Sequence, residues 1–182
     1  TLAHELGHGV HQVLAGPQGA LMSATPLTLA ETASVFGEML TFRSLLDRTT
    51  DKGERKAMLA QKVEDMINTV VRQIAFYQFE RKVHAERRNG ELTSDRICEL
   101  WLSVQAESLG PSVRFGDGYE TFWAYIPHFI HSPFYVYAYA FGDCLVNSLY
   151  GVYQNAPAGF QDRYFEMLKA GGTKHHSELL AP

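Results

Sequence analysis

The sequence predicts an all-α fold. Apolar residues recur at three- and four-residue steps through most of the 182 positions, which is the period of an amphipathic helix. No segment alternates apolar and polar residues in the way that indicates a β-strand. Turn signals separate the periodic segments at Gly16-Pro17, Asp51-Lys52-Gly53, Gly90 and Gly110-Pro111. We therefore expect one helical domain over residues 1–182, without an internal linker.

Three helices are expected in the first half of the chain. The first covers residues 2–15, and a loop over residues 18–28 follows it. The second helix covers residues 29–48 and the third covers residues 54–88. The third helix carries a stripe typical of an amphipathic helix, formed by Leu59, Val63, Met66, Ile67, Val70, Ile74, Tyr77 and Val83.

Three further helices are expected in the second half. One begins near residue 94, because either Thr93 or Ser94 can cap it, and it ends before Gly110. An aromatic helix over residues 133–153 and a last helix over residues 158–170 follow. Gly171-Gly172 and the polar residues after them predict a flexible loop.

Composition excludes several functional classes. The net charge is −4 with acids and bases interspersed, so neither a nucleic-acid surface nor an anionic-membrane surface is expected. Residues 126–153 are apolar overall, but His128, His131 and Asp143 interrupt them, and hydrocarbon penalises such groups heavily. We expect this segment to be a buried helix beside a polar cleft and not a membrane span.

The cysteines and the chain start bear on the expected location. Cys98 and Cys144 lie in apolar helical patterns without a Cys-x-x-Cys pair, so we expect buried, reduced thiols in a cytoplasmic protein. The opening residues do not show a charged segment followed by an apolar one, so secretion is not expected. Because the chain starts only three residues before His4, we expect it to be a segment of a longer protein, with apolar surface available for self-association.

The opening segment His4-Glu5-Leu6-Gly7-His8 carries the most informative pattern in the chain. Residues four apart on a helix lie one turn apart on the same face, so both imidazoles can reach one ion. Zinc accepts such a pair, and Glu5 is placed to hold a water on the metal. This His-Glu-x-x-His pattern is typical of metallopeptidases. It predicts His4 and His8 as zinc ligands, with Glu5 beside them.

Glu31 and Glu38 are candidates for completing this site. They lie seven residues apart on the second expected helix and therefore share a face. One carboxylate would be the third zinc ligand, and the other would accept the spare ring N–H of a ligand histidine. Alternatively, Glu31 is a carboxylate favoured by the helix dipole, and Glu38 is a solvated acid. His11 is expected to pack or to form hydrogen bonds, and not to bind the metal.

A second group of candidates lies near the aromatic helix. His131, Tyr135 and Tyr139 are spaced four and four, and His128 is close by. Tyrosine and histidine can donate hydrogen bonds to the oxyanion that develops during amide hydrolysis. A tyrosine stripe at this spacing is otherwise a feature of helical cores.

Together these blocks resemble the thimet-type oligopeptidases, in particular the oligoendopeptidase F branch of that zinc metallopeptidase family. The matching residues are 4–11, 31–34 with Glu38, 126–129 and 133–139. The first block occurs in many zinc peptidases, whereas the order and separation of all the blocks are far more specific. The similarity extends over essentially the whole chain.

The resemblance implies a helical catalytic lobe of a zincin-type metallopeptidase that hydrolyses short peptides. It implies His4, His8 and Glu31 as zinc ligands and Glu5 as the general base and acid. It also implies that a histidine and a tyrosine stabilise the tetrahedral intermediate. Tyr135 and Tyr139 match the tyrosine positions best, while either His128 or His131 could be the histidine.

Three other functions are compatible with parts of the pattern. A zinc carboxypeptidase of similar helical build would use the same residues on a free carboxyl terminus. An iron oxygenase also uses two histidines and one carboxylate, but it leaves Glu5 without a role. A catalytically inactive helical binding module would bind no stoichiometric zinc.

Overall fold

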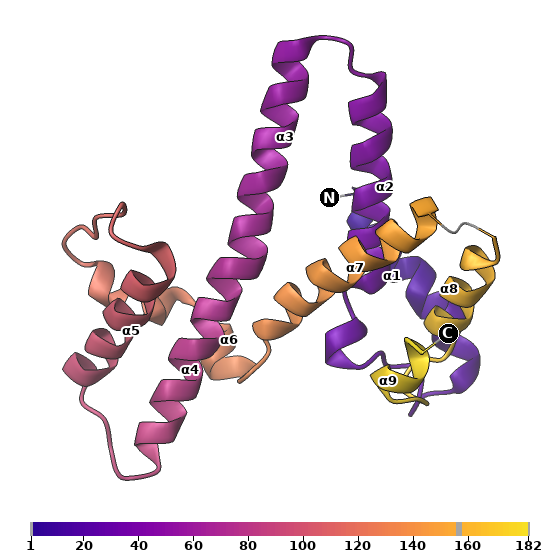
Figure 1. Cartoon of the computed structure of the whole chain (residues 1–182). Helices are drawn as coiled ribbons and strands as arrows, with labels where there is room; N and C mark the ends of the chain where they lie inside the picture. Colours follow the sequence, from indigo (N-terminus) through magenta and orange to yellow (C-terminus); the bar gives the residue numbers. More distant parts are fainter. Residues whose placement is uncertain (1, 156–157, 182) are drawn as a thin grey trace. The chain divides into compact units, whose positions relative to one another are not determined.

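The computed structural model describes residues 2–155 and 158–181, and these contain helices and no strand, which confirms the predicted all-α class (Figure 1). The chain divides into two compact units, one formed by residues 1–64 and 141–182 and the other by residues 65–140. The α-helices are α1 (Leu2–Ala15), α2 (Thr32–Arg48), α3 (Lys52–Met66), α4 (Gln73–Arg87), α5 (Ser94–Leu109), α6 (His128–His131), α7 (Tyr137–Asn155), α8 (Phe160–Lys169) and α9 (His176–Leu179).

The first unit is built around the packing of α1 against α2 and α8. Phe36 on α2 lies at the centre of an aromatic cluster, with the Tyr164 ring 4.8 Å and the Phe160 ring 5.9 Å from it. A neighbouring cluster joins Ala33 to Met167 and Leu168 of α8. Burial of these side chains holds the start of α2 against the rest of the unit. Glu31 lies directly before this start.

The second unit has a separate aromatic core. Trp101 of α5 is fully buried and contacts the rings of Phe76 and Phe79 on α4, at 5.5 and 5.2 Å. Its indole N–H donates to the backbone carbonyl of Tyr119, in the 3-10 segment η4 (Tyr119–Tyr125). Phe129 of α6 packs on the same phenylalanines. This core therefore supports the segment that carries His128.

Two of the predicted helices match the structure closely. α1 has the predicted bounds, and α5 begins at Ser94, with the Thr93 hydroxyl accepting the N–H of Arg96 at 3.2 Å. Of the two residues that could cap α5, Thr93 does so.

The predicted start of the second helix is wrong by three residues. A 3-10 segment, η2 (Leu27–Leu29), follows Pro26, and α2 begins only at Thr32. Glu31 stands at the N-cap with φ −90° and ψ 2°, and its side chain forms no capping hydrogen bond. The carboxylate is therefore available to other partners.

The third predicted helix is interrupted. α3 begins at Lys52, two residues early, because the Asp51 carboxylate accepts the N–H of Glu54 at 2.8 Å. A π-helical segment, η3 (Ile67–Arg72), separates α3 from α4. A π-helical turn contains more residues than an α-helical turn. The side chains of α4 therefore do not continue the faces of α3 in a regular α-helical register. Much of the predicted apolar stripe is exposed, namely Leu59, Val63, Ile67 and Ile74.

The aromatic helix begins four residues later than predicted, at Tyr137. Phe134 has a φ of 61°, which an α-helix does not allow. The polar segment after Gly171-Gly172 was predicted as a loop, but it contains the short helix α9. The predicted last helix is α8, over Phe160–Lys169.

Two expectations about the surface have different outcomes. Both cysteines are free, but Cys144 is exposed, so the prediction that both thiols are buried is wrong. Cys98 is partly buried and accepts the indole N–H of Trp123 at 3.5 Å. Within the described parts of the chain, no helix has both the length and the apolar character needed to cross a bilayer.

Candidate metal centre and aromatic histidine group

The side chains of His4 and His8 on α1 bring their Nε2 atoms close together. The Nε2 atoms of His4 and His8 lie 3.2 Å apart, and the two rings meet edge to face. Two ring nitrogens at this distance can share a hydrogen bond in one combination of tautomers, or they can bind the same ion. Both side chains are partly exposed, so an ion can reach them from solvent.

Glu31 is the third member of this group. Its Oε2 atom lies 3.5 Å from Nε2 of His4 and 3.4 Å from Nε2 of His8. Ligand atoms at three corners of a zinc tetrahedron, with bonds of about 2.0–2.1 Å, are separated by about 3.3 Å. The three separations fit this geometry, and His4, His8 and Glu31 are the residues in the described part of the chain that could hold a metal ion in this way.

Glycines allow the helices that carry the ligands to approach closely. A Cβ atom on Gly7 would lie 2.5 Å from the carbonyl oxygen of Ala33 and from Cα of Ser34. A Cβ atom on Gly37 would lie 2.9 Å from the Ala3 carbonyl oxygen. The absence of side chains at these two positions lets α1 and α2 pack backbone to backbone, which brings the Glu31 carboxylate to the histidines.

Ser34 orients the Glu31 carboxylate. Its side chain is fully buried, and its hydroxyl lies 2.8 Å from Oε2 of Glu31 and 3.0 Å from the Glu31 carbonyl oxygen. Since a hydroxyl has one proton, it donates to one of these oxygens at a time or is shared between them. Ser34 therefore fixes the oxygen that faces both histidines.

The remaining two acids predicted for this site lie beside it. The Glu38 Oε1 atom is 3.4 Å from Nδ1 of His4, the ring nitrogen that faces away from Glu31. Glu5 is exposed on α1, next to the histidine pair.

His11 has a different environment from His4 and His8. Its side chain is buried, and its Nε2 atom is 3.2 Å from the Thr25 hydroxyl oxygen. Burial, with a smaller contribution from repulsion by His8, lowers the pKa of His11. This neutral, hydrogen-bonded histidine matches the packing role expected for it.

In the second unit, His128 is surrounded by the two predicted tyrosines. Its ring stacks on Tyr135 at 5.6 Å and meets Tyr139 edge to face at 5.9 Å. The Tyr139 hydroxyl is 3.3 Å from Nε2 of His128. Tyr135 precedes α7, so it does not share a helical face with Tyr139, yet their rings are 5.3 Å apart. His131 is exposed at the end of α6.

The sequence did not predict the contacts of Ser34 with Glu31 or of Glu80 with Phe134. Ser34 lies three residues after Glu31, and that spacing on a helix could have indicated the contact. Glu80 accepts the backbone N–H of Phe134 at 2.7 Å, across 54 residues of sequence. No local pattern predicts a contact of this kind.

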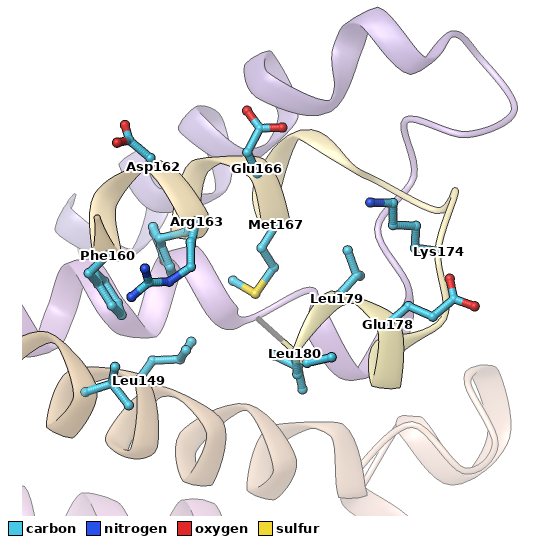
Figure 2. Close-up of a pocket in the computed structure, with 13 residues that line it drawn as sticks. Leu149, Phe160, Asp162, Arg163, Glu166, Met167, Lys174, Glu178, Leu179 and Leu180 are labelled. Carbon is cyan, nitrogen blue, oxygen red and sulfur yellow. The ribbon is translucent and has the colours of Figure 1, made fainter. Parts of the chain in front are cut away.

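A cavity lies elsewhere in the first unit. It has a volume of about 600 Å³ and is lined by residues of α7, α8 and positions 174–181, without any of the candidate metal ligands. Figure 2 shows Met167 of α8 pointing toward Leu149 and Leu180, while the carboxylates of Asp162 and Glu166 point away from them. It is therefore distinct from the histidine–glutamate group.

Comparison with known proteins agrees with these observations. The model of peptidase family M3 matches residues 1–182. The chain belongs to this family. It is 31% identical over 183 aligned residues to the chromosomal oligoendopeptidase F of Lactococcus lactis subsp. cremoris, covering 100% of the chain and 30% of that protein.

Two further comparisons extend this similarity. Oligopeptidase PepF of Bacillus subtilis is 30% identical over 182 aligned residues, covering 99% of the chain and 27% of that protein. The crystal structure of oligoendopeptidase-F from Enterococcus faecium superposes with a TM-score of 0.81 at 28% identity, over 99% of this chain and 32% of that one. The chain thus spans about 30% of the length of the relatives that it matches.

Proposed function

We propose that the chain carries the catalytic residues of a zinc-dependent endopeptidase that hydrolyses short peptides. The observation that carries this proposal is the convergence of Nε2 of His4, Nε2 of His8 and Oε2 of Glu31 at separations of 3.2–3.5 Å. Two imidazoles and one carboxylate form the ligand set of catalytic zinc sites that leave one position for water. Membership of peptidase family M3 supports peptide hydrolysis as the reaction.

When bound, zinc would polarise the scissile carbonyl and lower the pKa of a water molecule toward about 7. Glu5 takes the proton of the attacking water and passes it to the leaving amine. Its exposed position beside the histidine pair suits this exchange, because a general base must reach both the water and the substrate. Glu38 accepts the Nδ1 proton of His4 and so fixes the tautomer that presents Nε2 to the metal.

The aromatic histidine group supplies hydrogen-bond donors in this proposal. Tyr135 and Tyr139, with His128 or His131, stabilise the negative charge that develops on the carbonyl oxygen. The contacts within the second unit favour His128, because it touches both tyrosines. Loss of one such donor typically lowers kcat by about 10²–10³-fold.

The substitution Glu5→Gln in the full-length protein tests the proposal. The amide cannot accept the proton of water, so we expect zinc to bind at one equivalent while hydrolysis of a peptide blocked at both ends is abolished. Zinc content is measured by atomic absorption and cleavage by chromatography of the products. Glu54→Gln, an exposed glutamate at the start of α3, is the matched control and should keep both properties. Turnover by the Glu5→Gln variant would refute the assigned base.

A further inference from the structure

A buried carboxylate without a role in the proposed reaction lies in the second unit. Glu80 on α4 is only 2% exposed. Its Oε1 atom accepts the backbone N–H of Phe134 at 2.7 Å, while its Oε2 atom is buried without a hydrogen-bond partner in the described structure. Because burying a carboxylate is costly, a single hydrogen bond to one amide requires an explanation.

The N–H group that Glu80 accepts belongs to Phe134, whose backbone conformation is unusual. Phe134 is the non-glycine residue with positive φ in the described structure, at 61°. A residue with a Cβ adopts this conformation only when its surroundings enforce it. The Phe134 ring also contacts His84 at 4.8 Å and Tyr77 at 6.4 Å. Since Tyr77, Glu80 and His84 all belong to α4, one helix holds both the backbone and the ring of Phe134.

The conformation of Phe134 determines where the next residues point. The turn ends the segment after α6 and leads through Tyr135 into α7. Tyr135 stacks on His128, and Tyr139 in the first turn of α7 contacts both of them. A rotation of the Phe134 backbone into the helical region would carry Tyr135 away from His128.

We propose that Glu80 is a positioning residue, which holds the Phe134 turn and thereby assembles His128, Tyr135 and Tyr139. The role assigned to this group rests on the proposed endopeptidase function, whereas the assembly itself does not. Two histidines, His84 and His128, lie near enough to act electrostatically on the buried carboxyl. They oppose the effect of burial, which raises the pKa of Glu80.

The experiment compares Glu80→Leu, which removes the acceptor, with Glu80→Gln, whose amide oxygen can still accept the Phe134 N–H. Glu86→Leu is the control, since it makes the same change at a partly exposed glutamate of α4 that pairs with Arg96 at the surface and has no contact with Phe134. We expect Glu80→Leu to lower kcat at least about 10-fold, with KM within about 2-fold, because the donors act in the transition state. Glu80→Gln should retain most of kcat, and all variants should bind one zinc.

Two measurements by NMR test the assembly without any activity. In the unmodified protein, the Phe134 amide should exchange slowly with solvent, and nuclear Overhauser effects should connect the ring protons of His128 and Tyr135. Both signals should be lost in Glu80→Leu and kept in Glu80→Gln and Glu86→Leu. If the unmodified protein shows these signals but no hydrolysis, the proposed function fails while the positioning role stands.

Three results would overturn the positioning role. One is an unchanged kcat in a folded Glu80→Leu variant. Another is an equal loss of kcat in Glu80→Gln, which would show that the charge matters and not the acceptor. The third is fast exchange of the Phe134 amide in the unmodified protein, which remains decisive if Glu80→Leu does not fold.

Discussion

At the scale of single residues, the proposed metal centre depends on the orientation of the Glu31 carboxylate. The Ser34 hydroxyl contacts the same oxygen that faces His4 and His8. We expect Ser34→Ala to lower zinc affinity about 10–100-fold, because the carboxylate loses the donor that fixes it. Competition with a fluorescent chelator measures the affinity. Ser148→Ala, an exposed helical serine bonded to the Cys144 carbonyl, should leave affinity unchanged. An unaltered affinity in Ser34→Ala would contradict the orienting role.

The burial of His11 predicts that the stability of the folded chain depends on pH. Burial lowers its pKa in the folded state relative to its ordinary value of 6.5, so the unfolded chain binds the proton more readily. The contribution of His11 to stability is complete above about pH 6.5 and declines as pH falls from there to the lowered pKa, by at most about 1.4 kcal/mol per pH unit. Urea unfolding of the metal-free chain at pH 7.5 and 5.5 measures this loss. His11→Gln should show a smaller loss, and equal losses would refute the assignment.

The sequence predicts best the contacts that are local along the chain. His4 and His8 are one helical turn apart, and their spacing predicts their convergence. The sequence does not decide between the two alternatives for Glu31, because its approach to the histidines depends on how α1 packs against α2. It also does not decide between His128 and His131, since their distance to Tyr135 depends on a turn that no sequence period encodes.

At the scale of helices, the close approach of α1 and α2 brings His4 and His8 to Glu31, the three proposed ligands. Gly7→Ala places a methyl group 2.5 Å from the Ala33 carbonyl oxygen, so α1 and α2 must move apart. We expect a loss of about 1–3 kcal/mol in the free energy of unfolding, together with weaker zinc binding. Gly9→Ala is the matched control on the same helix, because nothing lies within 4 Å of the added methyl group. It should stabilise the helix by up to about 1 kcal/mol. Equal stability of the two variants would refute the close packing.

The helices that were predicted best have their end signals in the local sequence. Thr93 caps α5, and Gly16-Pro17 follows the end of α1. The start of α7 was predicted four residues too early, because aromatic periodicity continues through Phe134 although its backbone leaves the helical region. Contacts with α4, 50 or more residues away in sequence, fix that turn. Such long-range contacts are the part of the fold that periodicity does not predict.

At the scale of the whole molecule, α1 has two unlike faces. His4, His8 and His11 lie on the face toward the rest of the first unit, and four apolar residues of α1, Leu2, Leu6, Val10 and Val13, lie on the opposite face. Those apolar residues are exposed, with relative accessibilities of 73% for Leu2, 60% for Leu6, 49% for Val10 and 77% for Val13. An apolar stripe of this kind on an exposed helix favours association.

We expect the purified chain to self-associate through this stripe, because burial of its four side chains removes apolar area from water. The sedimentation coefficient should rise with protein concentration. The double substitution Leu2→Gln and Val13→Gln should suppress the rise while leaving Leu6 and Val10, which flank the metal ligands, in place. Leu21→Gln changes a leucine that is 91% exposed outside the stripe, and it should behave as the unmodified chain does. If the double variant associates as strongly as the Leu21→Gln control, the contact lies elsewhere on the surface. The exposed residues Leu59 and Val63 of α3 would then be the next to substitute.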